Sequence, residues 1–360
     1  MKRRIISLIL VLILLVPAVQ TAVADNSGLC FTATNDTLLE LSSMTVFIGG
    51  SSYVPAKAFS AFGIYMNYFN SESTALLSNA SKQIFFNLST GRTYDSSDTT
   101  YYVSATFQNG QVYVPVSWMC SYFGLYYSYT SGVGYGDILR IKNGSEVLTD
   151  AAFLEAATSL MKNRYNEYYG TTDPSSPSPS TSTGGQTGSQ GYGSSVTLNF
   201  IGLPSSDFLD KLDQYSAKVC FFVTADEVSE SPDIIRRIYG SGHSIGIFCQ
   251  SSPETECEQV SELIFEAAQT RPMLICASPA IESSASSYAD ENGYAYYKPV
   301  VTIPENAQYY TTITAKLKDL RGYTSFLIPI TDKTQNYISS VVEYIASNKI
   351  SMPPLLETLV

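Results

Sequence analysis

Histidine and tryptophan are nearly absent from this chain of 360 residues, which contains one of each. His243 is therefore the only imidazole available for base catalysis or metal binding, and one imidazole is far short of a histidine-based metal site. It also leaves little room for a Ser-His-Asp triad. A Cys–His nucleophile from Cys249 and His243 is nearly excluded, because six residues of one expected strand hold them about 20 Å apart. Dense glycine occurs only in a linker-like stretch, so a phosphate-binding loop is not expected.

Positive charge is scarce as well. Lys and Arg total 21 against 32 Asp and Glu, which gives a formal net charge of −11. Such a surface repels phosphate backbones, so nucleic acid is not an expected partner. Tyrosine, by contrast, is abundant at 27 residues. Most of these are expected to be half-buried strand residues, while exposed ones would suit binding of glycans or proteins.

A hydrophobic run long enough to span a membrane is lacking. The uninterrupted apolar stretch covers only Leu8–Val16, follows basic residues 2–4 and precedes the small residues Ala22-Val23-Ala24. This pattern predicts a cleaved signal peptide over residues 1–24. An uncleaved anchor is the alternative, but it would need about 20 apolar residues. We therefore expect a secreted or cell-wall-associated protein without a stable membrane span after cleavage.

Six cysteines follow this segment, in a compartment where thiols oxidise. Two lie in the first half of the chain and four in the second. These numbers permit one disulfide in the first half and two in the second, with no bridge between the halves. The alternative is a thiolate metal site near Asp226 or Glu227. The six are Cys30, Cys120, Cys220, Cys249, Cys257 and Cys276.

A stretch without aliphatic residues, rich in Ser, Thr, Pro and Gly, divides the chain at residues 170–195. Its composition cannot offset the entropy of ordering, so we expect a disordered linker. It separates a domain at 25–169 from a domain at 196–360. Helical spacing of apolar residues over 150–169 predicts a helix that closes the first domain.

The first domain contains an internal repeat. The segment Gly50–Tyr65, with its Tyr-Val-Pro and Phe-Gly-Ile-Tyr, recurs at Gly110–Tyr126 as Tyr-Val-Pro and Phe-Gly-Leu-Tyr. Each copy predicts a hairpin leading into a helix that begins at the proline and ends at the glycine. One copy is too small to bury its own apolar face, so two must pack together. The repeat resembles the copper amine oxidase N-terminal-like stalk domain, which implies an α+β spacer or wall-proximal module. The segment has no histidine, so copper binding is not expected.

The second domain alternates expected strands and helices, which predicts an α/β fold with a parallel sheet and a site at the carboxyl ends of its strands. The expected strands are 196–200, 217–224, 244–249, 273–277, 295–301 and 325–329. The expected helices are 206–215, 233–239, 255–269, 283–292, 312–320 and 335–348.

Three runs carry a family resemblance. They are Val196–Pro204, Lys218–Thr224 and the structural motif Gly242-His243-Ser244-Ile245-Gly246. In this order and spacing they resemble the T-F-D-D-G-P, K-A-T-F-F-V and G-H-E-I-G-N-H runs of the polysaccharide deacetylase (NodB-homology) family. The resemblance implies a distorted (β/α) barrel. It also implies a metal held by one carboxylate and two imidazoles.

The catalytic positions of that family are degenerate in this sequence. The paired acids correspond to Ile201 and Gly202, and the two metal-binding histidines to Phe248 and Ser252. The arginine-containing run corresponds to 276–280 and the late histidine run to 328–330. His243, with Gly242 and Gly246, corresponds to a packing residue outside the metal shell. We therefore expect no catalytic residue, no metal and no cofactor.

Three hypotheses follow for the function. The first is a secreted envelope protein with an inactive deacetylase-like domain that binds cell-wall or extracellular polysaccharide. The second is an active metal-dependent polysaccharide deacetylase with other ligands, and the third is a structural or interaction protein of the envelope.

Overall fold

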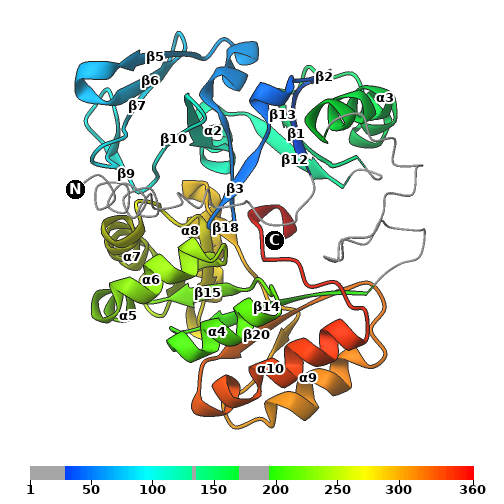
Figure 1. The fold of residues 1–360 in the computed structure, drawn as a ribbon. Coiled ribbons are helices and arrows are strands. Elements are labelled where there is room, and N and C mark those ends of the chain that lie inside the picture. The colour runs from blue at the N-terminus through cyan, green and yellow to red at the C-terminus, as the bar shows by residue number, and fades with distance from the viewer. Residues whose placement is uncertain (1–28, 132–134, 170–193) are drawn as a thin grey trace, which may run out of the picture.

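The computed structural model describes residues 29–131, 135–169 and 194–360. We call residues up to 169 the N-terminal region and residues from 194 the C-terminal region. The expected signal peptide lies outside the described residues, and so does nearly all of the expected linker. Figure 1 shows the N-terminal region above the C-terminal region, with the end of the chain between them.

The N-terminal region is rich in β-structure and forms three sheets. Their strand orders are β12-β13-β1-β2, β10-β11-β4-β3 and β5-β6-β7-β8-β9. The strands are β1 (Cys30–Thr34), β2 (Thr37–Leu38), β3 (Val46–Ile48), β4 (Ser51–Pro55), β5 (Tyr65–Phe69), β6 (Thr74–Ser78), β7 (Gln83–Asn87), β8 (Thr93–Asp95), β9 (Thr100–Tyr101), β10 (Thr106–Gln108), β11 (Gln111–Pro115), β12 (Tyr126–Thr130) and β13 (Asp137–Lys142). The helices are α2 (Val116–Phe123) and α3 (Asp150–Tyr169), with short 3₁₀-helices η1 (Leu41–Ser43), η2 (Ala56–Phe62) and η3 (Asn70–Glu72).

The two similar sequence segments form similar elements. β4 leads into η2 and β11 into α2, and each helix ends at a left-handed glycine, Gly63 at φ 72° and Gly124 at φ 71°. Pro55 and Pro115 end their strands instead of opening the helices as expected, because both keep extended ψ angles of 132° and 125°. The first helix is also a 3₁₀-helix rather than an α-helix.

The strands of the two segments pair with each other. β4 and β11 are antiparallel, with Val54 opposite Val114, and both valines are fully buried. Their apolar faces are therefore buried together. The helix expected at 150–169 forms as α3, and the buried Arg140 fixes its start by ion pairs of 2.7 Å to Asp150 and 2.8 Å to Asp36.

The C-terminal region is a seven-stranded parallel sheet flanked by helices, in the order β18-β17-β16-β15-β14-β20-β19. Its strands are β14 (Ser195–Ile201), β15 (Cys220–Val223), β16 (Ser244–Cys249), β17 (Leu274–Ala277), β18 (Ala295–Tyr296), β19 (Val301–Thr302) and β20 (Tyr323–Pro329). Its helices are α4 (Ser206–Gln214), α5 (Ala225–Glu230), α6 (Pro232–Gly240), α7 (Pro253–Ala268), η4 (Pro279–Ile281), α8 (Glu282–Asn292), α9 (Tyr309–Leu317), α10 (Asp332–Ser347) and η5 (Glu357–Leu359).

The sheet is a curled half-barrel, in line with the distorted (β/α) barrel that the resemblance implied, and its two edge strands do not pair with each other. The strand expected at 295–301 is two short strands, β18 and β19, which form opposite edges of the sheet. Residues 297–300 join these edges. Helix α5 was not expected from the sequence, since only six residues form it.

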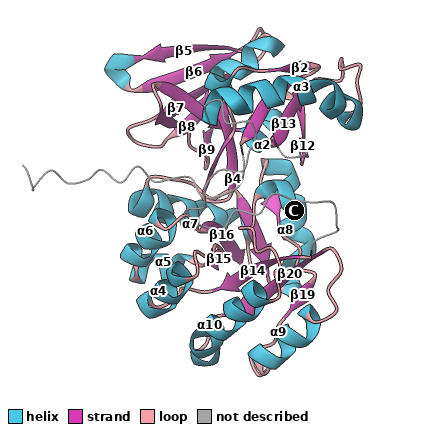
Figure 2. Cartoon of the chain, turned by 45° about the vertical axis from the view of Figure 1, so that its right-hand side comes forward, coloured by secondary structure: helices cyan, strands magenta, loops and turns pink. Residues whose placement is uncertain are grey.

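The N-terminal region packs against the amino ends of the parallel strands (Figure 2). At the tip of the β3–β4 hairpin, the Gly49 carbonyl accepts a hydrogen bond of 3.1 Å from the Ile245 amide at the start of β16. The Gly50 carbonyl accepts one of 2.9 Å from the Glu357 amide in η5. A Cβ on Gly50, whose φ is 95°, would lie 2.8 Å from Leu274 Cδ1, so the tip requires glycine. The hairpin thus reaches the edge opposite the expected site.

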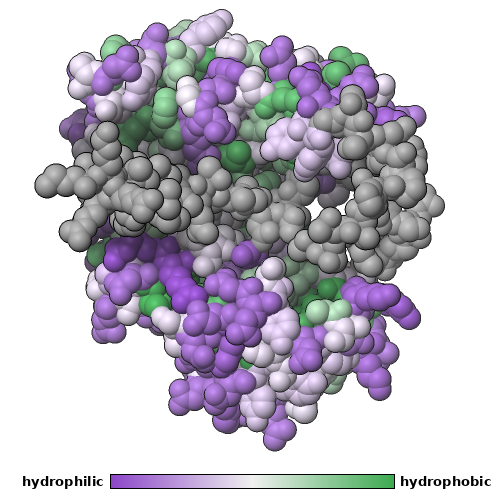
Figure 3. Space-filling model, viewed as in Figure 1, coloured by the Kyte–Doolittle hydropathy of each residue, from purple (hydrophilic) through white to green (hydrophobic). Residues whose placement is uncertain are grey.

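The surface seen in Figure 3 is mostly hydrophilic over both regions. Several tyrosines are nevertheless exposed, among them Tyr65 at 62 % and Tyr126 at 67 %. Within the described ranges, no helix combines the length and the apolar character needed to cross a membrane.

Candidate functional site

The four positions that the resemblance equates with catalytic or metal-binding residues lie at the carboxyl ends of neighbouring strands. Ile201 is the last residue of β14 and Gly202 follows it, whereas Phe248 lies in β16 and Ser252 is the N-cap of α7. β14 and β16 both pair with β15 in parallel. The fold therefore brings these positions to one edge of the sheet.

The face of the sheet turned away from the flanking helices carries a buried apolar cluster. Ile201 packs against a buried cluster there, and the Phe222 ring stacks on Tyr297 with centroids 5.3 Å apart and planes 10° apart. The buried members of this cluster are Cys220, Phe222, Phe248, Leu274, Cys276, Ala295, Tyr297, Leu327 and Leu355. Carbon side chains thus occupy the space below the expected site.

The residues at these positions do not fit a divalent metal. The side chains of Ile201 and Phe248 carry no donor atom, Gly202 has no side chain, and Ser252 offers a neutral hydroxyl. Across residues 29–131, 135–169 and 194–360, no group of three or more His, Cys, Asp or Glu side chains is placed to hold a metal ion.

One carboxylate does lie at this edge, but it already has partners. A Cβ on Gly202 would lie 3.2 Å from Glu227 Oε1 and 3.6 Å from Ile330 Cβ, so three segments meet there. Glu227 Oε2 accepts hydrogen bonds of 2.8 Å from both the amide and the hydroxyl of Thr224. This arrangement is the capping box of α5, in which the Glu227 carboxylate accepts from the Thr224 amide and the Thr224 side chain accepts from the Glu227 amide.

A second carboxylate organises the loop after β16. Glu256 in α7 accepts hydrogen bonds from the amides of Gln250, Ser251 and Ser252, at 3.0 Å, 3.3 Å and 3.1 Å. The loop that the resemblance equates with a metal-binding loop is tied to the first turn of its own helix. Negative charge in that turn also complements the helix dipole.

His243 lies far from this edge, just before β16. Its Nδ1 accepts a hydrogen bond of 3.3 Å from the Val219 amide, and its ring meets Phe221 edge-on with centroids 5.6 Å apart. Burial, with the nearby Lys218 ammonium as a smaller cause, lowers the pKa of His243 to about 4. The imidazole is therefore neutral at physiological pH and joins two strands.

The two glycines of the same motif serve backbone and packing requirements. Gly242 has a φ of 77°, which only glycine adopts readily. A Cβ on Gly246 would lie 2.4 Å from the Phe222 ring, so Gly246 makes room for that ring in the apolar cluster.

The six cysteines are free thiols in the structure, and all are buried. The structure therefore contains none of the bridges that the cysteine count permits. Cys249 and Cys257 come near each other, but their sulfur atoms are 3.9 Å apart, about twice the length of a disulfide bond. Burial raises the pKa of Cys220 and Cys276, the latter to about 12, so neither is a thiolate ready to bind metal.

Sequence reasoning missed one buried polar residue in the half-barrel. Asn199 in β14 is fully buried, and its Nδ2 donates to Tyr297 Oη at 2.7 Å and to the Phe326 carbonyl at 3.1 Å. Its Oδ1 has no hydrogen-bond partner among the described residues. The signal in the sequence was an asparagine within an otherwise apolar strand.

Comparison with known families identifies part of the C-terminal region. Residues 195–276 match the family model described as polysaccharide deacetylase. A search of curated proteins found no match.

Solved structures of deacetylases resemble the same region at low identity. A peptidoglycan deacetylase from Bacillus subtilis is 18 % identical, with 44 % of this chain and 87 % of that chain covered and a TM-score of 0.38. A polysaccharide deacetylase from Bacillus cereus is 16 % identical over 45 % and 91 % of the two chains, with a TM-score of 0.39. A family 4 carbohydrate esterase from Streptomyces lividans is 16 % identical over 46 % and 94 %, with a TM-score of 0.39. The C-terminal region is thus similar to polysaccharide deacetylases, and the match of the family model is confined to residues 195–276.

Proposed function

We propose that this chain is a secreted or cell-wall-associated protein whose deacetylase-like region binds polysaccharide without hydrolysing it. One observation carries the proposal. Ile201 and Phe248, at two positions where the resembled enzymes hold metal ligands or catalytic acids, are part of an apolar cluster.

The chemistry of deacetylation explains why this observation matters. In the resembled family, a metal ion activates water and polarises the acetamide carbonyl. Here Gly202 and Ser252 supply neither charge nor imidazole, while Glu227 is engaged in a capping box and Glu256 accepts hydrogen bonds from amides of its loop. Without those groups, the protein can bind a sugar chain, but the amide bond of the sugar would not be activated at this edge.

Polysaccharide as the ligand class follows from the family match and from the N-terminal region. The resembled enzymes act on glycans, and the B. subtilis structure is described as a peptidoglycan deacetylase. A stalk-like N-terminal region, as its resemblance implies, would hold the C-terminal region near the wall. Exposed tyrosines are well suited to sugar contacts.

The test uses the purified full chain. We expect less than about 0.1 equivalent of zinc, cobalt or nickel by metal analysis after dialysis, and no acetate released from acetylated peptidoglycan or chitin oligosaccharides. The same preparation should co-sediment with insoluble peptidoglycan. The peptidoglycan deacetylase from B. subtilis provides the active control.

Two other results would each favour a different function. One tightly held metal ion per chain, or release of acetate, would overturn the proposal in favour of an active deacetylase. Failure to bind any envelope polysaccharide would overturn it in favour of a structural or interaction protein.

A further inference from the structure

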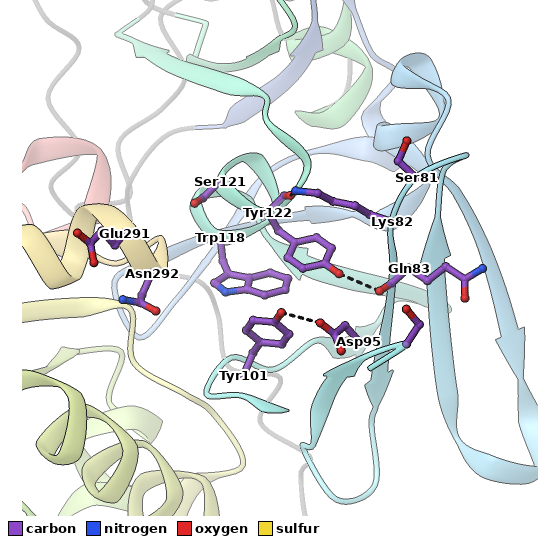
Figure 4. A pocket seen from close by; sticks show the side chains of 11 residues that line it. Ser81, Lys82, Gln83, Asp95, Tyr101, Trp118, Ser121, Tyr122, Glu291 and Asn292 are labelled. Atoms are coloured by element: carbon purple, nitrogen blue, oxygen red, sulfur yellow. Dashed lines mark hydrogen bonds between the residues drawn. The ribbon is translucent and has the colours of Figure 1, made fainter. Parts of the chain in front are cut away.

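A cavity of about 450 Å³ lies where the two regions meet, away from the carboxyl ends of the parallel strands (Figure 4). Most of its wall comes from the N-terminal region, and Glu291 and Asn292 complete it from the end of α8. The volume is within the range of about 300–1,000 Å³ that is typical of ligand sites.

The two walls of the cavity are fastened together. Ser117 Oγ donates a hydrogen bond of 2.9 Å to the carbonyl of Gly293, directly after α8. A Cβ on Gly293, whose φ is 72°, would lie 2.9 Å from Trp118 Cα, so the backbones touch there. The cavity is therefore a fixed part of the junction between the regions.

Three aromatic rings form one side of the cavity. Trp118 and Tyr122, one helical turn apart in α2, stack with centroids 4.9 Å apart and planes 15° apart. Tyr101 meets both rings edge-on, at 5.3 Å and 5.7 Å. Hydrogen bonds of 2.9 Å hold the two phenols in place, from Tyr101 to Asp95 and from Tyr122 to the carbonyl of Gln83. Such an ordered wall loses little entropy when a ligand binds.

The charges in the cavity select against ions. Lys82 is the single cationic side chain of the lining, and its Nζ lies 5.1 Å from the Tyr122 centroid while it donates to the Tyr122 carbonyl. The chain's own ammonium thus occupies the position over the ring that a bound cation would take. Asp95 and Glu291 add two carboxylates against this one ammonium, which disfavours an anion.

We propose that this cavity binds one unit of a neutral oligosaccharide. A pyranose has an apolar C–H face, which packs on aromatic rings, and hydroxyl or acetamido groups, which need carboxylate, amide and hydroxyl partners. Tyr122 lies between Trp118 and Lys82, so the Tyr101 ring is the one left for the C–H face, and Asp95, Glu291 and Asn292 supply the polar partners. The inference rests on the proposed glycan binding and assigns that binding to the junction between the regions.

Trp118 makes the test direct, because it is the only tryptophan of the chain. The full chain is titrated with the N-acetylglucosamine tetrasaccharide, followed both by calorimetry and by tryptophan fluorescence. We expect a saturable fluorescence change whose midpoint agrees with the calorimetric Kd. Tetramethylammonium serves as the cation probe and should cause no change.

A double substitution on α8 tests the location. Glu291 and Asn292 are exposed, so Glu291→Ala with Asn292→Ala should fold normally and weaken binding at least about fivefold, the value of roughly one hydrogen bond. The matched control is Glu343→Ala with Asn348→Ala at the end of α10. Asn348 Nδ2 donates to the Tyr344 carbonyl at 2.8 Å, just as Asn292 Nδ2 donates to the Tyr288 carbonyl at 2.9 Å. This control should bind like the unaltered protein.

The possible results separate the two proposals. Calorimetric binding without a tryptophan response, and unchanged in the α8 variant, would overturn this site and leave the proposed function standing. A response to tetramethylammonium but not to the saccharide would overturn the ligand class. Absence of binding to the saccharide and to insoluble peptidoglycan would overturn both proposals.

Discussion

Ser52 in the β3–β4 hairpin donates a hydrogen bond to the buried carboxyl group of Glu357, 305 positions later in the chain. Glu357 is 2 % exposed, and its second oxygen has no hydrogen-bond partner among the described residues. A carboxylate in such surroundings is costly, so the proton is retained. The contact between the two regions therefore contains a titratable group.

Replacement of Glu357 should change how stability depends on pH. Burial raises the pKa of Glu357 to about 7 from 4.5. The folded protein keeps the proton where the unfolded chain has lost it, so this contribution is complete below pH 4.5, declines as the pH rises and is lost above pH 7. Its size is roughly 3 kcal/mol. We expect Glu357→Gln to be more stable than the unaltered protein at pH 8 by about that amount, measured by urea unfolding.

The control for this experiment is Glu343→Gln, an exposed change on α10. It should leave the pH profile unaltered. Parallel profiles for Glu357→Gln and the unaltered protein would show that the carboxyl group of Glu357 titrates normally.

Replacement of His243 should reduce the loss of stability in acid. Because the pKa of His243 is lowered to about 4 from 6.5, the unfolded chain takes up a proton that the folded protein does not. Its contribution is present above pH 6.5 and is lost as the pH falls to about 4. His243→Asn can still accept the Val219 hydrogen bond, and we expect it to lose roughly 3 kcal/mol less on acidification. The free energy of unfolding is measured in urea at pH 7 and at pH 4. An equal decrease for His243→Asn and the unaltered protein would contradict this expectation.

A methyl group at the hairpin tip should weaken the packing of the two regions. In Gly50→Ala, the new Cβ meets Leu274, Ser244 Oγ at 2.9 Å and the Leu355 carbonyl at 3.0 Å. The matched control is Gly110→Ala in the other sequence segment, where φ is also positive, at 77°, but nothing lies within 4 Å. Both variants lose about 1–3 kcal/mol of stability because alanine is strained at a positive φ. Gly50→Ala should lose about 1–3 kcal/mol more from overpacking. Equal losses of stability in thermal unfolding would argue against the docked arrangement.

The thiols should be unreactive until the protein unfolds. All six are buried, and burial raises the pKa of Cys30 and Cys120 as well as those of Cys220 and Cys276. We expect almost no reaction with a disulfide reagent such as DTNB in the folded protein, and six equivalents per chain in guanidinium chloride. Fewer than six in the unfolded protein without a reductant would reveal disulfides that the structure does not contain.

The sequence was sufficient where the signal is local. The expected strand at 244–249 has the same bounds as β16, because its apolar residues form a short run after a glycine turn. The single strand expected at 295–301 was wrong, since β18 and β19 belong to opposite edges of the sheet. The curl of the sheet decides where a strand ends. The cysteine count permits bridges that the structure does not contain, since count and compartment do not place sulfur atoms within bonding distance.

The sequence by itself determined which donors the chain possesses: a single imidazole, and no charged side chain at Ile201, Gly202, Phe248 or Ser252, the positions that the resemblance equates with the metal ligands and acids. Only the tertiary structure decided that Ile201 and Phe248 join one apolar cluster, that Trp118 and Asn292 line one cavity, and that Glu357 is buried against Ser52. The physical reason is that composition and period are properties of neighbouring residues, whereas burial and charge state depend on segments hundreds of residues apart.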